Sequence, residues 1–137
     1  MAGYSPTPLA RKLGYKEGFR VYLHEPPGDY EDALEPLPDS IAFISEAKGA
    51  NMVHLFTRSR DELALLLPML MEQIDPDGMI WVSWPKKASK VPTDITENTI
   101  RQVCLPLGLV DIKVCAVDDT WSGLKLVIRK ELRKNYR

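Results

Sequence analysis

The stretch 79–87, MIWVSWPKK, constrains the fold more than any other part of the chain. Its first part, 79–85, is apolar apart from one serine and predicts a strand buried on both faces, as is typical of a mainly parallel sheet. Pro85 has no N–H to donate and ends the pairing, so Lys86 and Lys87 begin a basic loop. In open α/β sheets ligands bind beyond the carboxyl ends of the strands. A binding site is therefore expected in this loop.

Short apolar segments alternate with helical patterns along the chain. Because a crossover between parallel strands takes a dozen or more residues, the short link 118–123 predicts an antiparallel hairpin. The expected fold is a three-layer α/β domain with a mostly parallel, Rossmann-like sheet of about six strands and 80–83 at its centre. The expected strands are 19–23, 41–44, 52–56, 80–83, 112–117 and 124–128.

Two longer helices are predicted from apolar residues at helical spacing. In the first, 59–74, Ser59 and Glu62 form a capping box and Pro68 is expected to kink or shorten the helix. In the second, which Gly108 closes, the expected capping box is Asp94 with Glu97. Short helices are expected at 29–34 and at 7–14, the latter with Thr7 as N-cap, Pro8 at the first helical position and Gly14 beyond its end.

The 137 residues fit a single domain, 1–137, with a helical segment 1–18 docked on the sheet and a basic tail at 129–137. A composition of 45% hydrophobic and 27% charged residues is ordinary for a globular protein. The longest apolar stretch, 63–71, is too short to span a bilayer, and no signal-peptide pattern begins the chain. We therefore expect a cytoplasmic protein. Cys104 and Cys115, which have no metal-ligand spacing, are expected to be buried free thiols.

Charge is unevenly distributed although the net charge is only −1. Residues 21–47 contain no Lys or Arg but several acidic residues, whereas the tail 129–137 is basic. The low net charge argues against nucleic acid as the main partner. The tail is interpreted as a solvated strand end, and the alternative is a phosphate-binding tail. The acidic span and the basic end could also meet across a homodimer.

The candidate ligand-binding residues are Ser83, Trp84, Lys86, Lys87, Lys90 and Trp121. They lie at the end of the central strand and in the hairpin loop, which are expected to approach each other above the sheet. Aromatic faces beside ammonium groups suit a nucleotide, a phosphorylated metabolite or single-stranded nucleic acid. The alternative is that the tryptophans anchor the core and the lysines only aid solubility.

No catalytic residue, metal site or cofactor is predicted from the sequence. The segment 24–28 has two prolines and one glycine where a nucleotide-binding fold would carry its glycine fingerprint. His54 is interpreted as a core histidine, and the pair Asp118 and Asp119 as turn residues. Glu46, just past the second strand, could accept hydrogen bonds from a ribose, but an exposed loop acid is the commoner case.

Two resemblances arise from longer motifs. The strand–helix alternation with a closing hairpin, and the phrase 77–83 (DGMIWVS), resemble the carboxyl-terminal half of a class I methyltransferase fold. That family binds S-adenosylmethionine (SAM) at a glycine-rich loop after its first strand, which 24–28 does not match. The segments 5–14, 81–87 and 118–125 resemble the bacterial family catalogued as domain of unknown function 3052, which implies no activity.

Three hypotheses of function follow. The first is a noncatalytic Rossmann-like domain that binds a small molecule or a protein partner, because no cofactor cradle, metal cluster or activated nucleophile is present. The second is a divergent SAM-dependent, methyltransferase-like small-molecule transferase. The third is a weak binder of nucleic acid or phosphate, through Lys86, Lys87, Lys90 and the basic tail. The missing cofactor loop predicts that SAM is not bound in the usual methyltransferase manner.

Overall fold

The computed structural model describes residues 7–137, so Ser5 and Pro6 of the amino-terminal motif lie outside the described part. The chain forms one six-stranded sheet in the order β2-β1-β3-β4-β6-β5. The strands are β1 (Arg20–His24), β2 (Ala42–Ile44), β3 (Met52–Phe56), β4 (Met79–Pro85), β5 (Leu109–Ala116) and β6 (Trp121–Ile128). The helices are α1 (Leu9–Leu13), α2 (Tyr30–Ala33), α3 (Arg60–Gln73) and α4 (Glu97–Leu107), with 3-10 helices η1 (Lys87–Ser89) and η2 (Lys130–Tyr136).

The sheet is parallel from β2 through β1 and β3 to β4, and β6 then pairs antiparallel with both β4 and β5. This confirms the predicted α/β fold with its closing hairpin. β4 has a strand on each side, which confirms its central place, and it ends at Pro85, paired with Trp121. The strand order turns back between β1 and β3, so the carboxyl ends of these strands mark the topological switch point.

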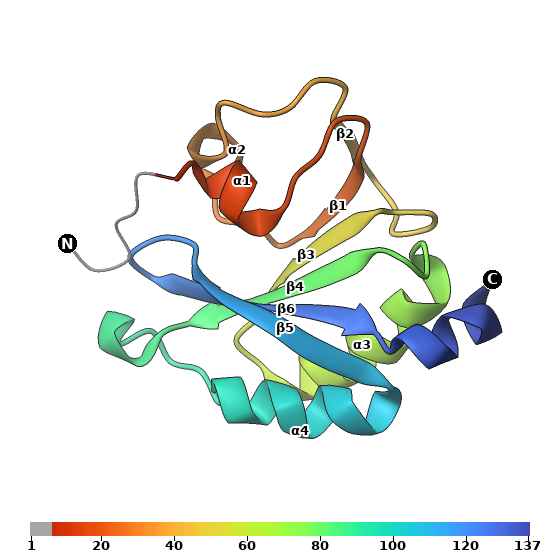
Figure 1. Cartoon of the computed structure of the whole chain (residues 1–137). Helices are drawn as coiled ribbons and strands as arrows, with labels where there is room; N and C mark the ends of the chain where they lie inside the picture. The colour runs from red at the N-terminus through yellow and green to blue at the C-terminus, as the bar shows by residue number, and fades with distance from the viewer. Residues whose placement is uncertain (1–6) are drawn as a thin grey trace.

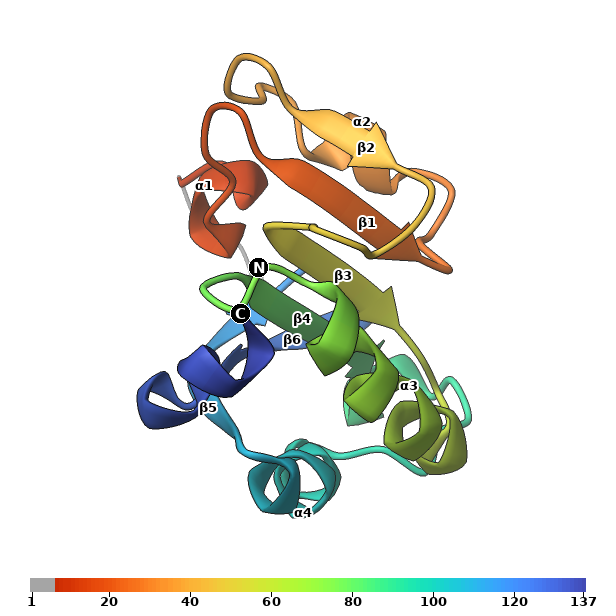
Figure 2. The same ribbon diagram turned by 90° about the vertical axis from the view of Figure 1, so that its right-hand side faces the viewer.

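Helices cover both faces of the sheet, with α1 and α2 on one face and α3 and α4 on the other (Figures 1 and 2). Along β4, Ile80, Val82 and Trp84 join the core under α3 and α4, while Trp81 joins the core under α1. The fully buried Trp81 donates its indole N–H to the carbonyl of Leu13, at 2.8 Å. This bond ties α1 to the central strand.

The helix α3 runs without interruption through Pro68, so the predicted shortening is wrong. Pro68 lies on the exposed side of the helix, where the carbonyl of Ala64 that loses its bond can face water. The N-cap is Ser59 as predicted, and its hydroxyl accepts from the N–H of Glu62. The carboxylate of Glu62 accepts from the hydroxyl of Thr57, so only half of the expected capping box forms.

Two other helix starts differ from the prediction. At α4 the capping box consists of Thr96 and Thr99, and Asp94 accepts from the N–H of Arg60, at 2.7 Å. A residue that can cap its own helix is used here to hold the start of a neighbouring one. At α1 the N-cap is Pro8, one residue later than expected, and Gly14 ends the helix in the left-handed region as predicted.

The carboxyl-terminal part corrects one further expectation, the one for the tail. In β5 the apolar Ile112 and Val114 are 56% and 51% exposed, while Cys115 faces the core. The tail is a 3-10 helix rather than a solvated strand end, because Leu132 and Tyr136 pack against the core. Arg133 and Arg137 of this tail form ion pairs with Asp77.

Both cysteines are buried and free, as expected. None of the helices in residues 7–137 combines the length and the apolar character that a bilayer crossing needs.

The turn before β4 gives a test of this packing. A Cβ added at Gly78 would lie 2.7 Å from the carbonyl oxygen of Asn51 and 2.9 Å from that of Asp75, and both are backbone atoms. We expect Gly78→Ala to lower the free energy of unfolding by about 1–3 kcal/mol, measured by urea denaturation. Gly28→Ala is the matched control because nothing lies within 4 Å of its added Cβ. Equal stability of both variants would contradict the described turn.

Candidate functional site

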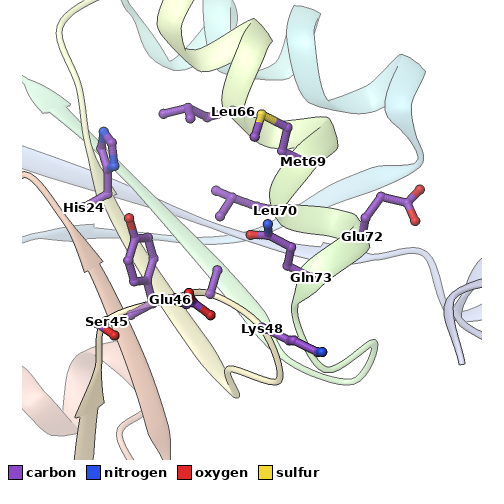
Figure 3. A pocket seen from close by; sticks show the side chains of 11 residues that line it. His24, Ser45, Glu46, Lys48, Leu66, Met69, Leu70, Glu72 and Gln73 are labelled. Carbon is purple, nitrogen blue, oxygen red and sulfur yellow. The ribbon is translucent and has the colours of Figure 1, made fainter.

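A pocket of about 610 Å³ opens at the carboxyl ends of β1 and β2, facing α3. Figure 3 shows its two walls, with His24 and Glu46 on the strand side and Leu66, Met69 and Leu70 on α3. Met69 is 51% exposed, so one wall offers uncovered apolar surface. Glu72 and Gln73 also line the α3 wall, so the pocket combines an apolar patch with several polar groups that could fix the orientation of a small molecule.

His24 and Glu62 meet beside this pocket. The Nε2 atom of His24 lies 3.7 Å from a carboxylate oxygen of Glu62, too far for a hydrogen bond. This nitrogen is buried and has no hydrogen-bonding partner among residues 7–137. An unpaired buried polar atom costs about 1–3 kcal/mol. Because this atom is not accessible from the pocket, a polar atom of a ligand would reach it only after a neighbouring side chain moves.

A second hollow, of about 450 Å³, lies at the switch point itself. Its wall includes Glu25 after β1, Thr57 after β3, Glu62 of α3 and Trp121 of β6. The His24–Glu62 pair therefore stands between the two hollows, with one partner lining each. These two residues are far apart in the sequence, and the pairing of β1 with β3 brings their segments together.

The loop after β1 does not fit a glycine-rich SAM cradle. Pro26 and Pro27 have no N–H to offer a ligand, and the N–H of Tyr30 bonds to the carbonyl of Pro27 within the turn. Glu25 has φ 53°, a left-handed conformation that glycine adopts at lower cost. Backbone contacts to an adenosyl cofactor from this loop are therefore few.

The structure brings together only part of the predicted site. Trp84, Lys87 and Lys90 line a third hollow of about 380 Å³ at the end of β4. The expected approach of the two loops is present, because the N–H of Lys86 donates to the carbonyl of Thr120, at 2.8 Å. Whether this hollow takes a ligand stays a prediction.

The tryptophans and the serine of the predicted site are largely buried. Trp84 is only 7% exposed and packs in the core under α3 and α4. Trp121 packs on the other face, edge-on to Phe56 at 5.2 Å between ring centroids. Ser83 is fully buried and hydrogen-bonded to His54. The two tryptophans and the serine thus have separate surroundings.

A chain of buried hydrogen bonds explains Ser83. The hydroxyls of Tyr15 and Tyr30 lie 2.8 Å apart, and Tyr30 reaches Nδ1 of His54 at 2.6 Å. Nε2 of His54 lies 2.7 Å from the Ser83 hydroxyl. Both histidine nitrogens are therefore satisfied, in keeping with the interpretation of His54 as a core residue, and burial lowers the pKa of His54 to about 3. Burial raises the pKa of Tyr15 and Tyr30, because for a tyrosine the charged form that burial disfavours is the deprotonated one.

Within the described part of the chain, no group of three His, Cys, Asp or Glu residues is arranged to hold a metal ion. The polar groups at the switch point can orient a small molecule by hydrogen bonds. Among the acidic and histidine residues that line the two hollows, only Glu46 was suggested as a ligand by the sequence, through its place after β2. The sequence signal for His24 was its position at the end of β1.

His54 predicts a measurable pH dependence. Its folded-state pKa lies below the value of about 6.5 in the unfolded chain, so the unfolded state takes up the proton first as the pH falls. The free energy of unfolding should fall from pH 7 to pH 5 by about 2 kcal/mol from this residue, and His54→Gln should remove that part. Urea denaturation at both pH values measures the difference.

A measurement on the unchanged protein serves as the control. The NMR signals of the His54 ring should stay in their neutral positions down to about pH 4. A midpoint near 6.5 in the folded protein would contradict its burial.

Comparison with solved structures identifies the fold as that of class I SAM-dependent methyltransferases. DhpI in complex with SAH has a TM-score of 0.61 at 10% identity, covering 90% of this chain and 84% of that one. Magnesium protoporphyrin IX methyltransferase from Synechocystis PCC 6803 with bound SAM has a TM-score of 0.55 at 10% identity, covering 88% of this chain and 74% of that one. The ribosomal protein L11 methylase from Lactobacillus delbrueckii subsp. bulgaricus has a TM-score of 0.54 at 12% identity, covering 88% of this chain and 77% of that one.

No protein-family model matches the chain, and no curated protein matches it. Identities of this size establish a common fold and leave activity to be argued from the site.

Proposed function

We propose that this protein binds a small nucleoside-type molecule in the pocket between β1, β2 and α3. The observation that carries the proposal is a pocket of ligand size at the carboxyl ends of β1 and β2, lined by His24, whose buried Nε2 has no hydrogen-bonding partner in residues 7–137. Glu46 follows β2 at the mouth of the pocket, where its carboxylate can accept hydrogen bonds from a ribose diol. Leu66 and Met69 provide the apolar surface for a base.

The proposed role is that of a noncatalytic ligand-binding domain with the methyltransferase fold. The prolines after β1 leave few backbone donors for the part of SAM beyond its nucleoside. A nucleoside should therefore supply most of the affinity. The segments 81–87 and 118–125 further support membership of the bacterial family of unknown function named above, as part of this proposal.

A divergent SAM-dependent transferase is the second candidate. It is favoured by the solved neighbours, several of which have SAM or SAH bound, and by the His24–Glu62 pair at the switch point. A histidine beside a carboxylate commonly acts as a general base, which removes a proton from the reacting group of a substrate. The two candidates differ in how much the methionine part of SAM adds to binding.

Isothermal titration with adenosine and with SAM separates the candidates. We expect the two dissociation constants to agree within about threefold, because the loop after β1 offers the methionine part little. Binding of SAM more than about tenfold tighter than adenosine would favour the transferase instead. If neither compound binds saturably, the proposed ligand class is wrong.

Variants locate the site. Glu46→Gln and His24→Phe should each weaken adenosine binding by about tenfold or more, the effect of one lost hydrogen bond to a charged or buried group. Lys87→Ala is the matched control, since it changes the separate hollow at the end of β4. A loss of binding in Lys87→Ala alone would move the site to the β4 hollow.

A further inference from the structure

Four lysines gather where α1 meets the β5–β6 hairpin. Lys113 and Lys125 are direct cross-strand partners in the antiparallel register, so their side chains leave the same face of the sheet side by side. Lys12 of α1 and Lys16 just after it complete the group, which we call the lysine cluster. Like charges placed directly opposite each other destabilise a hairpin.

The lysine cluster is held in place by hydrogen bonds. Nζ of Lys113 donates to the carbonyl of Lys12 at 2.8 Å, and Nζ of Lys12 donates to the carbonyl of Ala116 at 3.3 Å. These reciprocal bonds join α1 to β5 and fix two ammonium groups at the junction. Lys113 has a structural role, because its ammonium group satisfies a carbonyl in the last turn of α1. This role gives no reason for a second lysine, Lys125, directly opposite Lys113.

No described carboxylate balances this charge. In residues 7–137 the ion pairs involve none of the four lysines. Asp111, two residues before Lys113, is held by Arg101 of α4 at 2.9 Å. The pKa of Lys125 is lowered, first by burial and then by repulsion from Lys113 and Lys16. The folded chain thus keeps an uncompensated, half-buried positive charge.

We propose that the lysine cluster binds a compact, multiply charged oxyanion, namely a phosphate or diphosphate group. Neighbouring ammonium groups on one face of the hairpin suit the clustered charge of such a group. A nucleic-acid strand fits less well, because single-strand sites stack bases on exposed aromatic rings. Tyr15 and Trp81, which neighbour the cluster in sequence and in register, are both buried. The cluster lies on the face of the sheet opposite the nucleoside pocket and is independent of it.

Pyrophosphate is the probe, added at constant ionic strength to the whole chain. Ligand that binds the native state raises the melting temperature, so we expect a saturable rise in the wild type. Lys125→Met should melt at a higher temperature without ligand, since a repelled, desolvated charge is gone. The same variant should bind pyrophosphate at least about tenfold more weakly, as loss of one charge-assisted contact implies.

Lys87→Met is the control variant, because it makes the same change in net charge at η1, away from the cluster. It should respond to pyrophosphate like the wild type. Lys113→Gln, at an exposed position, gives a second variant should Lys125→Met fold poorly. Equal responses in the wild type, the cluster variants and Lys87→Met, or no saturable response in the wild type, would overturn the proposal.

Two further results would assign the cluster to another partner and also overturn the proposal. One is binding of a single-stranded oligonucleotide more than about tenfold tighter than pyrophosphate, with the same loss in Lys125→Met. The other is a dimer in light scattering that disappears in Lys113→Gln. In that case the acidic span 21–47 of a second copy would be the natural occupant.

Discussion

A chain of four buried side chains, Tyr15, Tyr30, His54 and Ser83, holds the layer of α1 and α2 on the sheet. Helices of five and four residues are too short to be stable alone. Their positions must therefore come from tertiary contacts. Buried polar groups are tolerated only when their hydrogen bonds are made, so each link in the chain requires the next. The bond from Trp81 to Leu13 adds a second tie between this layer and β4.

On the face of the sheet covered by α3, the pocket results from the short connection between β2 and β3. Only residues 45–51 join β2 to β3, although crossovers between parallel strands usually take a dozen residues or more and contain a helix. No helix is formed in this connection, and Tyr22 and Ile44 stay only partly buried beside α3. The hollow lined by His24 and Glu46 lies in this uncovered region. A missing crossover helix thus creates space where the fold places ligands.

Much of the fold could be predicted from the sequence, because strand and helix periods are local. The capping of α4 could not, since Asp94 and Thr96 are equally able to cap and the choice depends on the N–H of Arg60. The opposite facing of Trp84 and Trp121 follows from the register that pairs Pro85 with Trp121, which no local pattern reveals. The meeting of His24 with Glu62 likewise depends on the β1–β3 pairing. Site geometry was therefore less predictable than the fold.

Satisfied and unsatisfied polar groups divide this molecule into scaffold and site. Both nitrogens of His54 are bonded, and the bonded chain closes on Ser83 without reaching the surface. By contrast, within residues 7–137 Nε2 of His24 has no hydrogen-bonding partner, and the half-buried ammonium of Lys125 forms none of the ion pairs. Natural sequences depart from local consistency mainly where function requires it. His24 and Lys125 lie on opposite faces of the sheet, so each of them marks a separate proposed site.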